Sequence, residues 1–184
     1  YLMEMPAFCD VLAGFASRSI YGQVGASREA ALILGYSLPF IASVSALAIQ
    51  AGSFRLEDVL AQPFSAVHVL AGLAFVLAVP ARLKSNPFSI PNAEQEIVAG
   101  PHVEYNGPAL ALFELAHGLE FVAVSALFAL LFVPRLPSPA LTLLAYLGAA
   151  LLLVATTSLL AAATARLQIH RAFRFYWTWG ALAA

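Results

Sequence analysis

The sequence predicts an all-α integral membrane protein, built as one helical bundle with at least five transmembrane spans. Its 184 residues are 61% hydrophobic and only 10% charged, with a mean hydropathy of +0.85, whereas a soluble domain carries about 25% charged residues. Several apolar stretches also approach the ~20 residues that a helix needs to cross a bilayer. Composition and segment length therefore both place the chain in a membrane.

Five apolar segments follow one another along the chain. The first is short and carries Glu4 and Asp10, and we expect it to be the second half of a span whose start is absent, so that the chain is a fragment. The third holds His68, and the fifth has no ionisable residue before Arg166. The expected spans cover about residues 1–16, 28–50, 64–83, 108–133 and 139–167.

The breaks between these spans have the composition of turns and interfaces. Residues 17–27 are small and glycine-rich, and the prolines of residues 86–91 and 134–139 block helix continuation. Residues 168–180 are basic and aromatic, a composition suited to the headgroup level of a bilayer. No internal repeat interrupts the pattern, so we expect residues 1–184 to form a single domain.

The distribution of Lys and Arg predicts the orientation. With five spans, the loops alternate sides, and the side richer in basic residues is cytoplasmic. The long acidic loop, residues 85–107, then faces the cytoplasm of a prokaryotic inner membrane. The basic side receives Arg18, Arg28, Arg82, Lys84, Arg166, Arg171 and Arg174, and the other side receives only Arg55 and Arg135.

Half of the acidic residues lie in one stretch, residues 91–120. Charge is expensive next to lipid, so a concentration of ionisable groups in a greasy chain indicates a function. The stretch contains Glu94, Glu96, Glu104, Glu114, Glu120, His102 and His117.

Glu114, His117 and Glu120 fall within roughly 120° of arc on one face of the fourth span. A charged face cannot contact lipid without a cost of about 2.5–3.5 kcal/mol per ionised residue. A histidine between two carboxyl groups suits a proton relay. The structural alternative is that the three groups only hydrogen-bond to neighbouring helices.

Glu94, Glu96 and Glu104 lie in the loop before that span. Three carboxylates on a loop suit a hard cation, proton conduction or a basic partner. The alternative is a solvated acidic loop, against which the interleaved apolar residues 97–99 and Tyr105 argue.

The other polar residues have plainer interpretations. Arg28 and Glu29 fit a helix start with Glu in the first turn, and His68 fits a packed core histidine. Glu4 and Asp10 do not share one helix face, so we expect at least one of them to point into the bundle. Arg171 and Arg174 suit headgroup anchoring.

The residues exclude several functions. With Cys9 as the only cysteine, the chain has neither an internal disulfide nor a cysteine-ligated iron–sulfur or zinc site of its own. It shows no nucleophile triad, phosphate loop, dinucleotide fingerprint, metal signature or nucleic-acid-binding basic patch. A buried acidic track without cofactor chemistry suits ion movement driven by a partner.

Three motifs resemble one family. Residues 93–107, with the pattern AEQE–GP–EYNG, resemble the signature loop of the H-type membrane subunit that docks the redox arm of respiratory complex I. The GASREA motif, residues 25–30, and Glu114 resemble more closely the counterparts in energy-converting NiFe hydrogenases and formate hydrogenlyase-type complexes. Residues 165–177 resemble the basic segment before the family's last helix.

This resemblance implies an eight-span, all-helical subunit when complete. Its cytoplasmic loops would contact iron–sulfur and hydrogenase-like subunits, which carry the clusters and a NiFe centre, and its carboxylates would lead to antiporter-like subunits. The implied coupling residues are Glu94, Glu96, Glu104, Glu114, His117 and Glu120, and the implied redox-arm junction is Arg28, Glu29, Tyr105, Arg166, Arg171 and Arg174. No catalytic residue, metal or cofactor is expected in this chain.

The chain also departs from the family pattern. Ser37 occupies a position where members often carry Glu, His117 falls where the complex I branch has Glu, and residues 168–171 replace the usual Arg-Ile-Asp-Gln. These departures weigh against a quinone site.

We therefore expect a non-catalytic subunit of a hydrogenase-type complex that couples electron transfer to proton or sodium movement. The alternatives are a quinone-site subunit of NADH:quinone oxidoreductase, a purely structural membrane anchor, and a stand-alone cation-coupled transporter. The last usually shows inverted repeats, which are not evident here. The sequence does not identify the ion, the electron donor or the number of partners.

Overall fold

The computed structural model describes residues 2–91 and 100–180, so Glu94 and Glu96 lie outside the described residues. The described part is built of helices, as the composition predicts. In chain order the elements are η1 (Leu2–Glu4), α1 (Met5–Ala16), α2 (Ile20–Ala51), α3 (Leu56–Leu60), α4 (Ala66–Arg82), η2 (Gly100–His102), α6 (Gly107–Phe132), α7 (Pro139–Ala163), α8 (Ile169–Phe175) and η3 (Tyr176–Gly180), the last being a π-helical turn.

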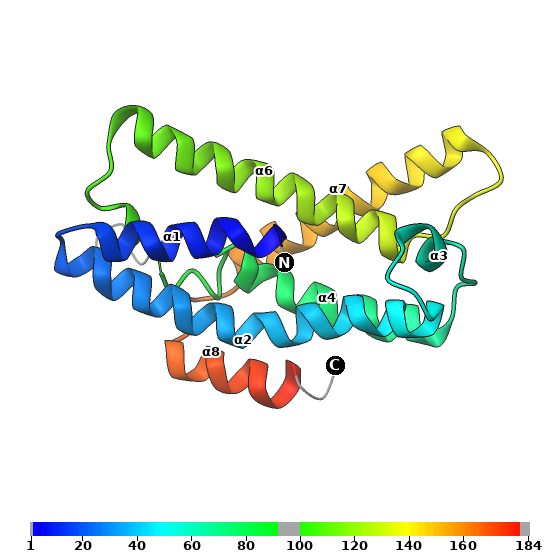
Figure 1. Ribbon diagram of the computed structural model, residues 1–184, viewed down its shortest axis with the longest axis horizontal. Helices are drawn as coiled ribbons and strands as arrows, with labels where there is room; N and C mark the ends of the chain where they lie inside the picture. The colour runs from blue at the N-terminus through cyan, green and yellow to red at the C-terminus, as the bar shows by residue number, and fades with distance from the viewer. Residues whose placement is uncertain (1, 92–99, 181–184) are drawn as a thin grey trace.

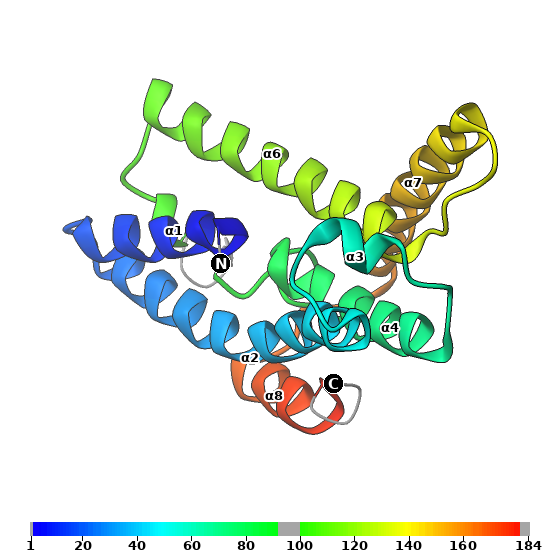
Figure 2. The ribbon, with the colours of Figure 1, turned by 45° about the vertical axis from the view of Figure 1, so that its right-hand side comes forward.

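The long helix α2 forms the centre of the molecule. Its 32 residues span about 48 Å at 1.5 Å per residue. Helices α1, α4 and α8 all pack on α2 (Figure 1). Helices α6 and α7 pack on each other as a second layer, which lies more loosely against the rest of the chain (Figure 2).

Helix α2 begins at Ile20 rather than near residue 28, so the prediction of a glycine-rich loop over residues 17–27 is wrong for most of that stretch. The glycines allow close packing instead. A Cβ atom on Gly25 would lie 2.7 Å from Pro101 Cδ, and one on Gly22 would lie 2.2 Å from Ser17 Oγ. Small residues here let α1, α2 and η2 approach one another, and the loop shrinks to residues 17–19.

Three helices are long and apolar enough to cross a bilayer, namely α2, α6 and α7, while α4 is a shorter apolar helix. Helix α1, with 12 residues, is shorter still. The five expected apolar segments are therefore all helical, but two of them fall short of a full span within the described residues. Helix α7 is almost uncovered by the rest of the chain, as expected for a helix that faces lipid or another subunit.

The remaining predicted breaks are confirmed. Residues 133–138 connect α6 to α7, and residues 83–91 follow α4 without regular helix. The basic and aromatic segment forms the short α8, whose following residue Tyr176 is fully buried and donates its hydroxyl to the Leu77 carbonyl at 3.0 Å. This bond ties the C-terminal part of the chain to α4.

Candidate functional site

Arg82, the last residue of α4, is the centre of a buried charge network. Its side chain is fully buried, forms ion pairs with Glu4 and Glu120, and donates to the Met3 carbonyl. The Glu120 contact, 3.1 Å from Nη2 to Oε1, is an ion pair without hydrogen-bond geometry. The guanidinium also lies 4.5 Å from the centre of the Phe40 ring, a cation–π distance. One cation thus joins η1, α4 and α6.

Lys84 provides the second cation of the network. It forms ion pairs with Asp10 on α1 and with Glu29 on α2, the latter at 3.4 Å between Nζ and Oε1. Burial alone would lower the pKa of Lys84, but the negative charges of Glu29 and Asp10 outweigh burial and raise it above its ordinary value. Lys84 therefore stays charged at neutral pH.

The network brings four carboxyl groups to two cations. Glu29 is only 1% exposed and Glu120 only 8%, and each has one carboxyl oxygen without a hydrogen-bond partner among the described residues. Several buried carboxylates with too few counter-charges cannot all remain ionised without a large desolvation cost. The arrangement can therefore bind and release protons.

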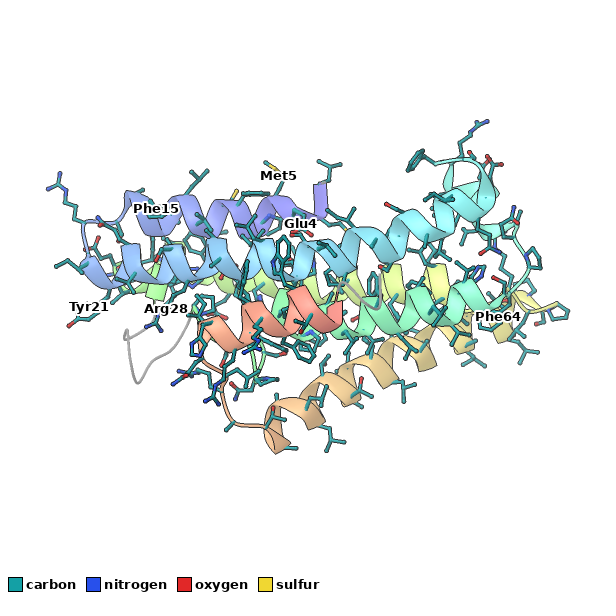
Figure 3. The ribbon with its side chains drawn as sticks, turned by 90° about the horizontal axis from the view of Figure 1, so that it is seen from below. Glu4, Met5, Phe15, Tyr21, Arg28 and Phe64 are labelled. Carbon is teal, nitrogen blue, oxygen red and sulfur yellow. The ribbon has the colours of Figure 1, made fainter. Side chains whose placement is uncertain are left out.

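Tyr36 extends the network along α2. Its side chain is completely buried, and its hydroxyl donates to Glu4 Oε2 at 3.4 Å. The chain of groups Tyr36, Glu4, Arg82 and Glu120 crosses from α2 to α6. Figure 3 shows Glu4 near the N-terminus of the polypeptide, between α1 and α2.

The three ionisable residues of α6 differ in their surroundings. Glu120 is buried against Arg82, His117 is half-buried, and Glu114 is exposed. The expectation that the face carrying all three would be buried is therefore wrong for Glu114 within this chain. The reason is that α6 packs on α1 and α4 only loosely, so the first turns of α6 lie open.

A groove of about 540 Å³ lies between α1 and α6. It is lined by Asp10, His117 and Glu120 together with apolar residues of both helices, including Phe113. His102 approaches the same region from η2, where its Nε2 lies 3.5 Å from Asp10 Oδ1 and its ring stacks on that of Phe113. The buried network is thus accessible from the groove.

The described part of the acidic loop packs against α1. Glu104 is exposed and accepts the Arg18 backbone N–H at 3.0 Å, and Tyr105 donates to the Ala13 carbonyl at 3.1 Å. These bonds anchor the end of the loop beside the N-terminal turns of α2. The Tyr105 ring also packs edge-on against Phe113, which lines the groove between α1 and α6.

The basic residues assigned to the junction gather at one end of the bundle. Arg28 and Arg166 line a pocket of about 340 Å³ together with His170, and Arg166 Nε donates to Ser89 Oγ at 3.2 Å. Arg171 and Arg174 are exposed on α8. Figure 3 shows Arg28 on α2 near the start of α8.

Sequence reasoning missed the two cations of the network. Arg82 and Lys84 look like a basic flank at a membrane surface, but both are buried. Glu29 is not in a first helical turn, because α2 starts at Ile20, and Glu4 and Asp10 both reach the network. The sequence did contain a signal, because Arg82 and Lys84 stand two positions apart at the end of an apolar segment. Such a pair could have been considered as the counter-charges of buried acids.

The fold and the site together define a class of protein, a helical membrane protein with a buried network of ion pairs between its helices. Within residues 2–91 and 100–180, no group of three or more His, Cys, Asp or Glu is placed to hold a metal ion.

Comparisons with known proteins identify the family. The family model described as NADH dehydrogenase matches residues 1–184, the whole chain. The chain therefore belongs to this family, that of the H-type membrane subunit of complex I.

Individual relatives agree with this assignment. The chain is 38% identical over 126 residues to the H-type subunit of the NADH-quinone oxidoreductase of Anoxybacillus flavithermus, and 39% identical over 126 residues to that of Geobacillus kaustophilus. Each match covers 66% of this chain and 38% of the relative, so the chain spans well under half of those relatives.

A solved structure shares the fold. One chain of the membrane-bound sulfane sulfur reductase, an archaeal respiratory membrane complex, superposes with a TM-score of 0.88 at 24% sequence identity. The match covers 99% of this chain and 64% of that chain.

Proposed function

We propose that the chain is part of a membrane-arm subunit that couples electron transfer in a peripheral redox arm to proton or sodium movement. The observation that carries the proposal is the buried network of four carboxyl groups around Arg82 and Lys84. A structural membrane anchor has no need of so many buried acids, because apolar residues in place of a buried ion pair are often as stabilising or more so. Family membership supplies the redox context.

The network supports coupling because its charge balance depends on helix position. Arg82 is shared between Glu4 on η1 and Glu120 on α6, so a small movement of either element changes which carboxyl group is neutralised. A carboxyl group that loses its cation in a buried site takes up a proton. In this proposal, events at the redox arm shift the helices, and Glu120 and Asp10 exchange protons through the groove beside His117.

The redox arm would dock at the end of the bundle where the acidic loop and the basic residues meet. Glu104 and Tyr105 lie there on the loop, and Arg28 and Arg166 line the nearby pocket. This surface carries both signs of charge, which favours a specific orientation of a charged partner. In this proposal the surface faces the cytoplasm. The set of residues proposed for coupling or docking is completed by Glu94, Glu96, Glu29, Arg171 and Arg174.

The partners would supply the electron carriers. Iron–sulfur subunits and antiporter-like subunits fit the proposed role, with either a NiFe centre or a quinone as the electron acceptor site. The relatives from Anoxybacillus and Geobacillus are named as quinone oxidoreductase subunits, which keeps the quinone alternative alongside the hydrogenase one. Nickel content, hydrogen evolution and quinone reduction of the purified assembly distinguish the two.

The coupling proposal is tested with Glu120→Gln and Glu114→Gln in the intact assembly. We expect Glu120→Gln to abolish ion translocation while electron transfer to a soluble acceptor continues, because Gln cannot carry the proton. Glu57→Gln is the matched control, since Glu57 is exposed on α3 and belongs to no ion pair among the described residues. Normal translocation by Glu120→Gln would refute the proposed role of the network, and normal translocation by Glu114→Gln would remove only Glu114 from it.

A further inference from the structure

A second polar pocket lies at the other end of α4, far from Arg82. It has a volume of about 250 Å³ and forms between the residues that precede α4 and the end of α6. Phe64, at this end, lies far from Arg28 in Figure 3. The pocket is lined by Val59, Leu60, Gln62, Pro63, Phe64, His68, and residues 130–135 of α6 and the turn after it.

His68 contributes a mostly buried imidazole ring to the wall of this pocket. It is only 7% exposed, and its Nδ1 accepts the Ser65 backbone N–H at 3.4 Å, which caps α4. Nδ1 also lies 3.1 Å from Ser65 Oγ, which itself donates to Gln50 Oε1. These contacts engage Nδ1, and no hydrogen bond from a described residue reaches Nε2, so the Nε2 edge of the ring is left for a ligand.

The other polar groups of the pocket favour a ligand that accepts hydrogen bonds. Arg135 is exposed and has no ion-pair partner among the described residues, and the Gln62 amide can donate as well. The start of α4, with its positive dipole end, lies on the same side. The acidic residues of α3, Glu57 and Asp58, are exposed and are not part of the lining.

The rim of the pocket is apolar. Phe64 is 57% exposed, and the neighbouring ends of α4 and α6 belong to apolar helices. A ligand with an anionic head and an apolar body would satisfy both the donors and the rim. Arginine and a histidine N–H are suited to phosphate oxygens.

We propose that this pocket binds the phosphate group of a membrane phospholipid. Arg135 contributes the charge, Gln62 and the Nε2 edge of His68 contribute polar contacts, and Phe64 packs against the start of the acyl chains. The site is independent of the proton-coupling proposal, because it shares no residue with the charge network.

The test measures lipid binding by the purified assembly with native mass spectrometry, with phosphatidylglycerol added at increasing concentration. We expect one saturable lipid, bound about tenfold more weakly after Arg135→Gln or His68→Gln, as the loss of one charge-assisted hydrogen bond predicts. The glutamine of His68→Gln can still cap the Ser65 N–H, and Arg135 is exposed, so neither change should unfold the chain. Arg55→Gln, an exposed basic residue outside the pocket, is the matched control and should bind the lipid normally.

Three outcomes would overturn the proposal. Equal lipid binding by all variants shows that the pocket is not the site. Equal weakening by Arg55→Gln shows that only general surface charge attracts the lipid. Displacement of the bound lipid by excess inorganic phosphate alone shows a free-anion site rather than a lipid site.

Discussion

Replacing Arg82 by Met is the most informative perturbation of the charge network. The substitution keeps an apolar stem of similar length but removes the cation shared by Glu4 and Glu120. Removing one partner of a buried ion pair costs about 3–5 kcal/mol, because the other charge is left buried without compensation. The Arg82 side chain is fully buried, so solvent does not screen this cost.

The expected result is a large loss of thermal stability. For a chain of this size, 1 kcal/mol corresponds to about 2–4 °C in Tm, so Arg82→Met should lower the apparent Tm by roughly 6–20 °C. Thermal unfolding of the detergent-solubilised protein, followed by tryptophan fluorescence, measures the shift. Arg171→Met is the control, because Arg171 is exposed on α8.

A variant series separates charge from packing. If the uncompensated carboxyl groups cause the loss, then adding Glu4→Gln and Glu120→Gln to Arg82→Met should restore most of the stability, since a neutral buried cluster carries no unpaired charge. Strictly additive losses would show that packing around Arg82, rather than charge, holds the helices together. An unchanged Tm for Arg82→Met alone would refute the reasoning outright.

Two further predictions concern other contacts. Gly25→Ala should destabilise the protein by about 1–3 kcal/mol, because the added Cβ would lie 2.7 Å from Pro101 Cδ. Gly118→Ala is the control and should not destabilise the protein, because the space around Gly118 is open. The unfolding temperatures of the two variants test this, and equal temperatures would contradict it. Lys84→Met should destabilise the protein at neutral pH. Burial lowers the pKa of Lys84, but its carboxylate partners outweigh burial and raise it above the ordinary value. The contribution of Lys84 to stability should therefore persist below pH ~10.4 and disappear as pH rises through the raised pKa. The difference in Tm between the native chain and Lys84→Met, measured from pH 8 upward, tests this sign; a difference that vanishes below pH ~9 would show that Lys84 is not held charged.

Much of the secondary structure could be predicted from local pattern. The apolar segments around residues 108–133 and 139–167 are helices whose starts differ by at most one residue from the prediction, since length and hydropathy are properties of each segment alone. The start of α2 could not be predicted in the same way. Gly22 and Gly25 look like loop residues, and only their contacts with Ser17 and Pro101 show that they serve close packing.

The sequence by itself determined that the chain belongs in a membrane and that its acidic residues need a purpose, because the cost of charge in an apolar chain does not depend on the fold. Only the tertiary structure decided which acids matter together. Glu4, Asp10, Glu29 and Glu120 are all more than 30 residues from Arg82 and Lys84 in the chain, and they meet because η1, α1, α2 and α6 converge on these two cations. Helical periodicity relates residues within one helix, whereas an ion pair between helices depends on how the helices pack, which no local pattern records.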